Sequence, residues 1–187
     1  MITGHLGVAG AVRSATRTST GAGALLLLAL LVASLTPDIV DGASVLFHIC
    51  NPYGLYSHTI PAVAIEAALV GALAYLMTGS RSITLSFVVV VILHIAADYF
   101  TGRKLLMPGG EMVGLRGYDR PLRDFVVEVS LVVVGWWLLR RSGRTPRWTT
   151  APWLLLFAIG VQAAFDSSVV GHGRSLKATA CFPATPR

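Results

Sequence analysis

The sequence predicts an all-α integral membrane protein, a polytopic transmembrane helical bundle of about five spans preceded by an N-terminal helix. Hydrophobic residues make up 54% of the chain and charged residues 13%, and the mean hydropathy is +0.68, outside the usual range of soluble domains. Apolar segments recur along the chain, each about 14–18 residues long, and flanking residues extend them toward the ~20 needed to cross a bilayer. These segments are 21–35, 60–77, 83–97, 125–139 and 151–164.

The N-terminal segment is predicted to remain in the mature protein. Arg13 and Arg17 precede the first long apolar run, but the lead of small and apolar residues is too long for a signal-peptide n-region. We therefore expect a helix over residues 2–19. Because no repeat or low-complexity linker is visible, residues 1–187 are interpreted as a single membrane domain.

The order of spans predicts which segments share a membrane side. We name the side of Arg13 X and the other side Y. Pro37 should end the first long helix on Y, because proline disfavours helical geometry in its predecessor. The loop 38–59 then stays on Y, a turn at Gly79-Ser80-Arg81 lies on X, and the segment 83–100 returns to Y. The loop 101–124 and the tail 166–187 also fall on Y, and the helix over residues 2–19 would start there.

Charge favours side X as the cytoplasmic side. The charged residues of its short loops are all arginines, whereas the cations of side Y are mixed with acidic residues or lie in the tail. The net charge of +6 could suggest nucleic acid, but these cations lie beside apolar spans. They indicate contacts with membrane lipids and no nucleic-acid partner. Cys50 and Cys181 share side Y, so a disulfide between them is possible.

His94 and Asp98 are the strongest candidate functional residues. They lie four residues apart, about one helical turn, so their side chains share a face, and ionisable groups at membrane depth are costly without a partner or a function. The predicted topology brings His5, Asp38 and His58 to the same side. Such a set suits a divalent metal, Zn²⁺ first and Mn²⁺ or Fe²⁺ as alternatives. The structural alternative is a hydrogen-bonded pair that locks two helices together.

Two acidic residues are candidates for acid/base catalysis, Asp41 and Glu66. Glu66 lies eight residues after His58, roughly on one helical face, and its alternative role is a buried hydrogen bond to another helix. Asp124 and Glu128 begin a predicted span, where acids suit the helix N-terminus. The loop after Asp98 is rich in cations that would suit an anionic headgroup or phosphate, or attract lipid in general. They are Arg103, Lys104, Arg116, Arg120 and Arg123.

Four spaced motifs carry a resemblance to a known family. They are Gly4-His5-Leu6, Leu35-Thr36-Pro37-Asp38, Tyr56-Ser57-His58-Thr59 and Leu93-His94-Ile95-Ala96-Ala97-Asp98-Tyr99-Phe100-Thr101, with Pro108 beyond. In this order they resemble the membrane-bound metal-dependent hydrolases, also described as YdjM-like or LexA-regulated inner-membrane hydrolases. The resemblance covers roughly residues 1–110. It implies a metal-dependent hydrolase in a bacterial inner membrane.

The chain departs from this family at two places. Where the family often has His-Arg-Gly before the histidine motif, this chain has Tyr53-Gly54-Leu55, and its carboxylates Asp38 and Asp41 are three apart rather than two. The first change removes a possible ligand and a phosphate-binding cation. Either Arg103 or His48 substitutes, or the substrate differs, or activity has been lost.

The predicted function is hydrolysis by metal-activated water at the outer, periplasmic face of the membrane. A lipid-linked phosphoester or ester is the expected substrate, because a site at headgroup depth meets lipids first. Two other classes remain open. A proton or metal-ion transporter would place carboxylates near the bilayer midplane, where only Glu66 is a candidate, and a scaffold would use a closed structural metal site.

Overall fold

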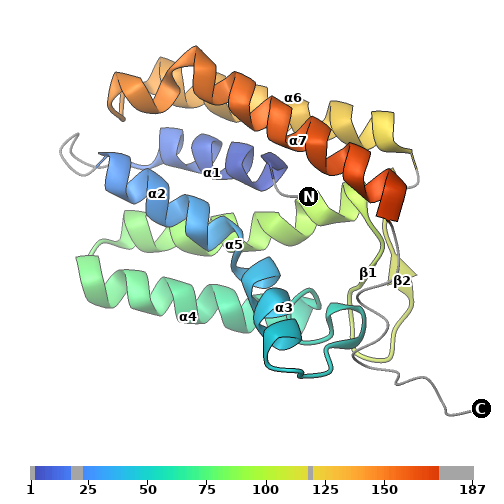
Figure 1. Ribbon diagram of the computed structural model, residues 1–187. Coiled ribbons are helices and arrows are strands. Elements are labelled where there is room, and N and C mark those ends of the chain that lie inside the picture. Colours follow the sequence, from blue (N-terminus) through green and yellow to red (C-terminus); the bar gives the residue numbers. More distant parts are fainter. Residues whose placement is uncertain (1–2, 18–22, 118–119, 173–187) are drawn as a thin grey trace, which may run out of the picture.

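The computed structural model describes residues 3–17, 23–117 and 120–172 (Figure 1). Within these ranges the all-α class is confirmed, with seven α-helices, two short 3₁₀ turns and one small β-hairpin. The helices are α1 (Thr3–Ala15), α2 (Gly23–Ser34), α3 (Thr36–Leu46), α4 (Ile60–Thr78), α5 (Arg81–Thr101), α6 (Pro121–Ser142) and α7 (Pro152–His172). The 3₁₀ turns are η2 (Pro52–Gly54) and η4 (Arg147–Thr150), and the strands β1 (Lys104–Leu105) and β2 (Met112–Val113) pair antiparallel.

The packing places polar groups inside and apolar groups outside. His5, Arg13, His58, His94 and Glu128 are fully buried, while large apolar side chains such as Leu76, Met77 and Phe157 are mostly exposed. A soluble protein of this size rarely exposes so much apolar surface. The arrangement therefore fits a bundle whose outer surface faces lipid and whose ionisable groups lie inside.

The number of candidate spans is smaller than the five predicted. Among the residues that the structure describes, only α4 and α5 are long and apolar enough to cross a bilayer by themselves, and a third span results if α2 and α3 count as one bent element. The physical reasons differ between the remaining helices. Helix α1 has only 13 residues, and α6 carries charged residues at both ends. The apolar part of α7, Pro152–Ser167, is shorter than a full membrane span.

The predicted loop over residues 38–59 is wrong in its first part, because α3 occupies Thr36–Leu46. Contrary to the prediction from the sequence, the chain does not enter a loop at Pro37. Pro37 lies in the first turn of a new helix, where a missing N–H costs nothing. Helices α2 and α3 meet at an angle of 57°, and the hydroxyl of Thr36 donates to the carbonyl of Ala33 at 2.9 Å, which supplies a partner at the break.

Helices α4 and α5 form the expected antiparallel hairpin. Thr59 caps the start of α4, and Gly79 ends it with a φ of 62°, a left-handed conformation that favours glycine. Ser80 then caps α5. This short connection places the start of α4 and the end of α5 at the same end of the bundle.

Helix α1 packs against α6 through glycines. A Cβ atom on Gly7 would lie 2.3 Å from the carbonyl oxygen of Leu131, and one on Gly135 would overlap the carbonyl oxygen of Gly7. Small residues allow helix backbones to approach this closely. The contact holds the short helix α1 inside the bundle, between α2, α5 and α6 (Figure 1).

Two other expectations concern the C-terminal part of the chain. The predicted tail from residue 166 is helical as far as His172, because α7 continues. The remaining residues, including Cys181 and hence the possible disulfide with Cys50, lie outside the described part of the chain.

Candidate metal centre

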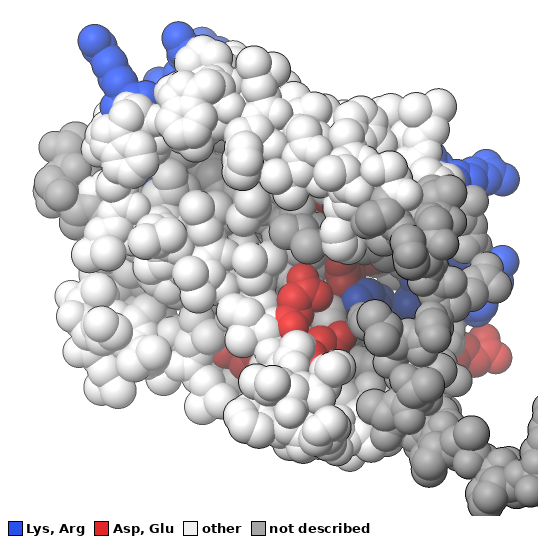
Figure 2. Space-filling view, in the orientation of Figure 1, with Lys and Arg blue, Asp and Glu red and all other residues white. Residues whose placement is uncertain are grey.

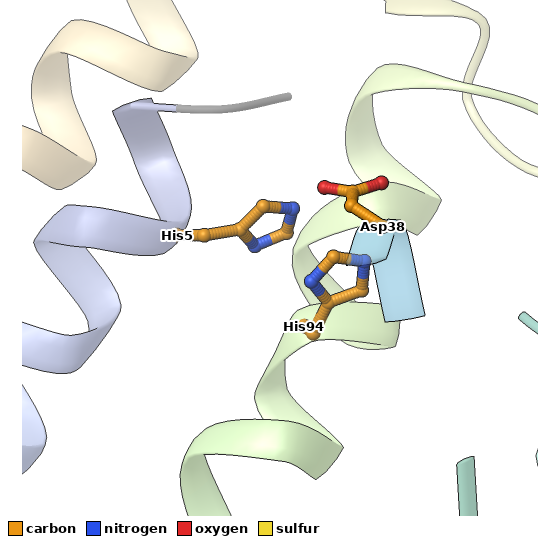
Figure 3. A group of neighbouring side chains, drawn as sticks. All are labelled: His5, Asp38 and His94. Atoms are coloured by element: carbon orange, nitrogen blue, oxygen red, sulfur yellow. The ribbon is translucent and has the colours of Figure 1, made fainter. Parts of the chain in front are cut away.

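The five predicted ligand residues lie together at one end of the bundle. His5 comes from α1, Asp38 from α3, His58 from the turn before α4, and His94 and Asp98 from the last turns of α5. Figure 3 shows three of them directed toward one another from separate elements. Two overlapping sets have potential ligand atoms within 4.8 Å of each other, His5 with Asp38 and His94, and His58 with His94 and Asp98.

The tautomer of His94 follows from its hydrogen bond to the break between α2 and α3. Its Nδ1 lies 2.7 Å from the main-chain carbonyl oxygen of Ser34. Because a carbonyl only accepts, Nδ1 must carry the proton, and in the neutral ring Nε2 is left with a lone pair. A metal-binding histidine is usually oriented by such a bond.

His58 is oriented by a chain of side chains on the opposite side. The hydroxyl of Ser57 donates its proton to Oδ1 of Asp41 at 2.6 Å and lies 2.7 Å from Nδ1 of His58. Since its proton is engaged, the hydroxyl accepts from Nδ1, and Nε2 of His58 again carries the lone pair. Asn51 donates to the same oxygen of Asp41 at 2.6 Å.

These two lone pairs face each other. Nε2 of His58 and Nε2 of His94 are 3.3 Å apart, and Oδ2 of Asp98 lies 3.2 Å from the first and 3.6 Å from the second. Two lone pairs and a carboxylate at such distances repel one another unless a proton or a metal ion lies among them. A tetrahedral site with bonds of ~2.0–2.1 Å has ligand separations of about 3.3–3.4 Å, so the three atoms fit a zinc-sized ion.

The charges around His58 also favour a cation at this place. Burial alone would lower its pKa, but the carboxylates of Asp38 and Asp98 outweigh burial and hold the pKa of His58 above its ordinary value. A proton or a metal ion can be that cation. The surrounding nitrogen and oxygen donors suit a divalent metal.

His5 adds a third imidazole. Its ring stacks on His94 with centroids 3.8 Å apart and planes 11° apart, and neither ring nitrogen makes a hydrogen bond within the described residues. Its Nε2 lies 3.3 Å from Oδ1 of Asp98, the oxygen that does not face His58. Asp98 therefore presents its two oxygens to different histidines, as a carboxylate that bridges two metal ions would.

The cluster is closed on most sides and open at one. The side chains of His5, His58 and His94 are inaccessible and that of Asp98 is 3% exposed, whereas Asp38 is 38% exposed. Lys104 on β1 is 17% exposed, and its Nζ lies 2.6 Å from Oδ2 of Asp98. Figure 2 shows acidic and basic side chains gathered in one hollow of the surface. The accessible side of the cluster is therefore the one formed by Asp38 and Lys104.

The two predicted acid/base residues occupy different places. Asp41 lies behind His58, with Oδ2 3.6 Å from its Nδ1, so the ring separates it from the inner side of the cluster. Glu66 is buried in α4, and its carboxyl oxygens have no hydrogen-bond partner among the described residues. Of the proposed substitutes for the missing cation, Arg103 donates to the carbonyl of Met112 at 2.8 Å and His48 is exposed.

Several contacts that support the site had no clear signal in the sequence. Oε2 of Glu128 accepts the main-chain N–H of Gly4 at 3.1 Å and so anchors the start of α1, which carries His5. The carbonyl of Ser34, which accepts from His94, is a main-chain group, so no pattern of side chains predicts its role. Ser57 was part of a motif, but its role depends on Asp41, sixteen residues earlier. Lys104 was visible only as one cation of a basic loop.

The fold and this cluster define a helical membrane protein with a buried His/Asp centre at one end of its bundle. The family described as YdjM inner membrane protein matches residues 1–167. The chain belongs to this family of inner membrane proteins, so the YdjM-like resemblance noted in its motifs is confirmed and extends beyond residue 110. No curated protein and no solved structure matches the chain.

Proposed function

We propose that the cluster is a divalent metal centre that hydrolyses a phosphoester or other ester carried on a lipid, at the periplasmic face of the inner membrane. The observation that carries the proposal is the pair of Nε2 lone pairs of His58 and His94, 3.3 Å apart and both near Oδ2 of Asp98. His58, His94 and Asp98 would hold the metal. His5 and Asp38 would complete the sphere or hold a second ion.

A divalent ion bound here would supply a water of lowered pKa and polarise the phosphoryl or carbonyl oxygen of the substrate. With His5 completing the coordination sphere, the carboxylate of Asp38 would be free of the metal, and as the exposed carboxylate of the set it would accept the proton from the attacking water and return it to the leaving oxygen. Lys104 would bind the anionic group of the substrate at the mouth of the site. Asp41 is a positioning residue, because it acts on His58 through Ser57.

The depth of the cluster favours a lipid as substrate. His58 directly precedes α4, and His94 and Asp98 lie in the last two turns of α5, so the donors gather at the same end of both candidate spans. A site at this level meets headgroups before it meets solutes from either aqueous phase. We further propose that α1, α6 and α7 complete the embedded bundle around α4 and α5.

Metal analysis of the purified protein tests the ligand set. The wild-type chain should retain about one or two divalent ions, and the variants His94→Ala and Asp98→Ala should lose them. His48→Ala removes an exposed histidine and serves as the matched control, which should retain the metal. Unchanged metal content in both ligand variants would remove the basis of the proposal.

Substrate turnover separates an enzyme from the other two classes. Metal-loaded protein should release phosphate or an acyl product from members of a lipid panel, and the His94→Ala variant should not. A transporter is the second candidate, because Glu66 is a buried carboxyl group within the apolar helix α4. Metal-dependent ion flux in proteoliposomes without lipid turnover, abolished by Glu66→Gln, would favour transport. Bound metal with neither activity would indicate a scaffold.

A further inference from the structure

The turn between α6 and α7 lies at the other end of α6 from Glu128, and its composition is unusual. Between Glu128 and Asp166 the chain has four arginines and no acidic residue, and all four tryptophans fall within residues 136–153. Trp137, Trp148 and Trp153 are 48%, 63% and 63% exposed. Exposed tryptophans of this kind mark the membrane–water interface. This end of the bundle therefore lies at headgroup level.

A pocket of about 620 Å³ opens at this level, between the end of α6, η4 and the start of α7. Two of its lining residues are arginines, Arg140 and Arg147, and none is acidic. Neither arginine forms an ion pair with another described residue. The pocket thus concentrates positive charge that no acidic side chain in the described part of the chain neutralises.

The wall of the pocket is fixed in place. The guanidinium of Arg140 lies 5.2 Å from the ring centroid of Trp136, a cation–π distance. The indole N–H of the same tryptophan donates to the carbonyl oxygen of Thr150 at 3.1 Å, which ties η4 to α6. A site whose cation and backbone are held before the ligand arrives loses less entropy on binding.

Two further polar features point to an anion. Thr145 lines the pocket, and its hydroxyl oxygen is buried and has no hydrogen-bond partner among the described residues. Pro152 begins the 21-residue helix α7 at the pocket, so the positive end of that helix faces it.

The neighbouring arginines are already engaged. Arg144 donates to the carbonyls of Ser14 and Thr16 at 2.7 Å and 3.0 Å, and Arg13 donates to the carbonyl of Arg144 at 2.6 Å. These two fasten α1 to the turn. Arg140 and Arg147 are left to face the pocket.

We propose that this pocket binds the phosphate group of an anionic phospholipid headgroup. Arg140 and Arg147 supply the charge, the Thr145 hydroxyl supplies a hydrogen bond, and the acyl chains lie along the exposed apolar side chains of α7, among them Leu156 and Phe157. The site is separate from the His/Asp cluster, so lipid would bind whether or not metal is present.

Native mass spectrometry of the full chain in detergent, titrated with phosphatidylglycerol or phosphatidylcholine, tests the proposal. Each arginine near a membrane surface contributes about a fivefold change in affinity, so R140Q/R147Q should weaken phosphatidylglycerol binding roughly 30-fold. R140K/R147K, which keeps the charge, should recover most of the affinity. The matched control R81Q/R141Q removes two arginines that do not line the pocket, and it should bind as the wild type does.

Three results would overturn the proposal. An equal loss in both glutamine double variants would indicate diffuse charge rather than a pocket. Equal binding of phosphatidylcholine and phosphatidylglycerol would remove the need for an anionic headgroup. Complete displacement of the lipid by millimolar inorganic phosphate would identify free phosphate as the ligand. Melting curves of each variant show whether it is folded, and the lysine variant provides the comparison if the glutamine variant is not.

Discussion

Replacing Ser57 by alanine tests whether His58 is a metal ligand oriented by its neighbours. Ser57 and His58 are both fully buried, and the hydroxyl joins Nδ1 of the ring to Asp41. The substitution removes one oxygen atom and leaves the Nδ1–H of His58 without its acceptor. An unsatisfied buried donor costs about 1–3 kcal/mol, and the ring loses the bond that fixes its tautomer.

The expected effect is on metal affinity. Loss of a group that orients a metal-binding histidine typically weakens binding 10–100-fold, which is about 1.4–2.7 kcal/mol. At a free Zn²⁺ concentration of about 100 times the wild-type Kd, the stabilisation by metal would fall from ~2.7 kcal/mol to about 1.4 or 0.4 kcal/mol for these two limits. Both quantities are measurable on purified protein, by competition with a chromophoric chelator and by thermal melting with and without metal.

Ser44→Ala is the matched control. Ser44 is also buried, but its hydroxyl donates only to the carbonyl of Val40 in its own helix at 2.8 Å. This variant should bind metal as tightly as the wild type. If Ser57→Ala binds Zn²⁺ with undiminished affinity, or if both variants lose the same amount, then the chain from Asp41 to His58 does not orient a ligand and the tautomer argument fails.

Three other outcomes are expected. Gly7→Ala should destabilise the protein by about 1–3 kcal/mol, since its Cβ would lie 2.3 Å from a carbonyl oxygen of α6, whereas Gly160→Ala, with open space around it, should be neutral or slightly stabilising in a melting experiment. The raised pKa of His58 stabilises the metal-free protein at low pH, and this contribution is lost as pH rises from 6.5 through the raised value. Metal binding needs the neutral ring, so the rise in Tm on adding Zn²⁺ should grow with pH, and a rise that shrinks with pH would contradict the assignment. Lys104→Met removes an ammonium group 2.6 Å from Oδ2 of Asp98. Zn²⁺ should then bind more tightly, while KM for an anionic substrate should rise. Unchanged values of both the Zn²⁺ affinity and KM would exclude Lys104 from the site.

The fold was predictable where a local pattern is sufficient. Apolar runs bounded by Pro, Gly and Ser gave α4 and α5 within a few residues, because caps and chain-wide hydropathy are properties of neighbouring residues. The same reasoning placed a loop where α3 lies, since Pro37 can end one helix or begin another. The number of spans was overestimated because an apolar run was counted as a span although it is short, as in α7, or lies between charged helix ends, as in α6.

The candidate centre was predictable in its members but not in its chemistry. The spacing of His94 and Asp98 and the order of spans were enough to predict that His5, Asp38 and His58 lie nearby. The sequence gives no direction for an imidazole nitrogen, the role of Asp41 rested on residue type, and that of Glu66 rested on its spacing from His58 along one helical face. The structure places Asp41 behind His58 and Glu66 buried in α4.

Local sequence thus determined that this is a helical membrane protein with histidines and carboxylates at one end of its spans, because hydropathy and helical periodicity act over short distances. The tertiary structure alone decided which atoms face one another. The lone pairs of His58 and His94 converge because a freed carbonyl at Ser34 and a hydroxyl at Ser57 hold the far side of each ring. Such contacts join residues distant in sequence or main-chain groups that have no side-chain signal, so they exist only once the bundle has packed.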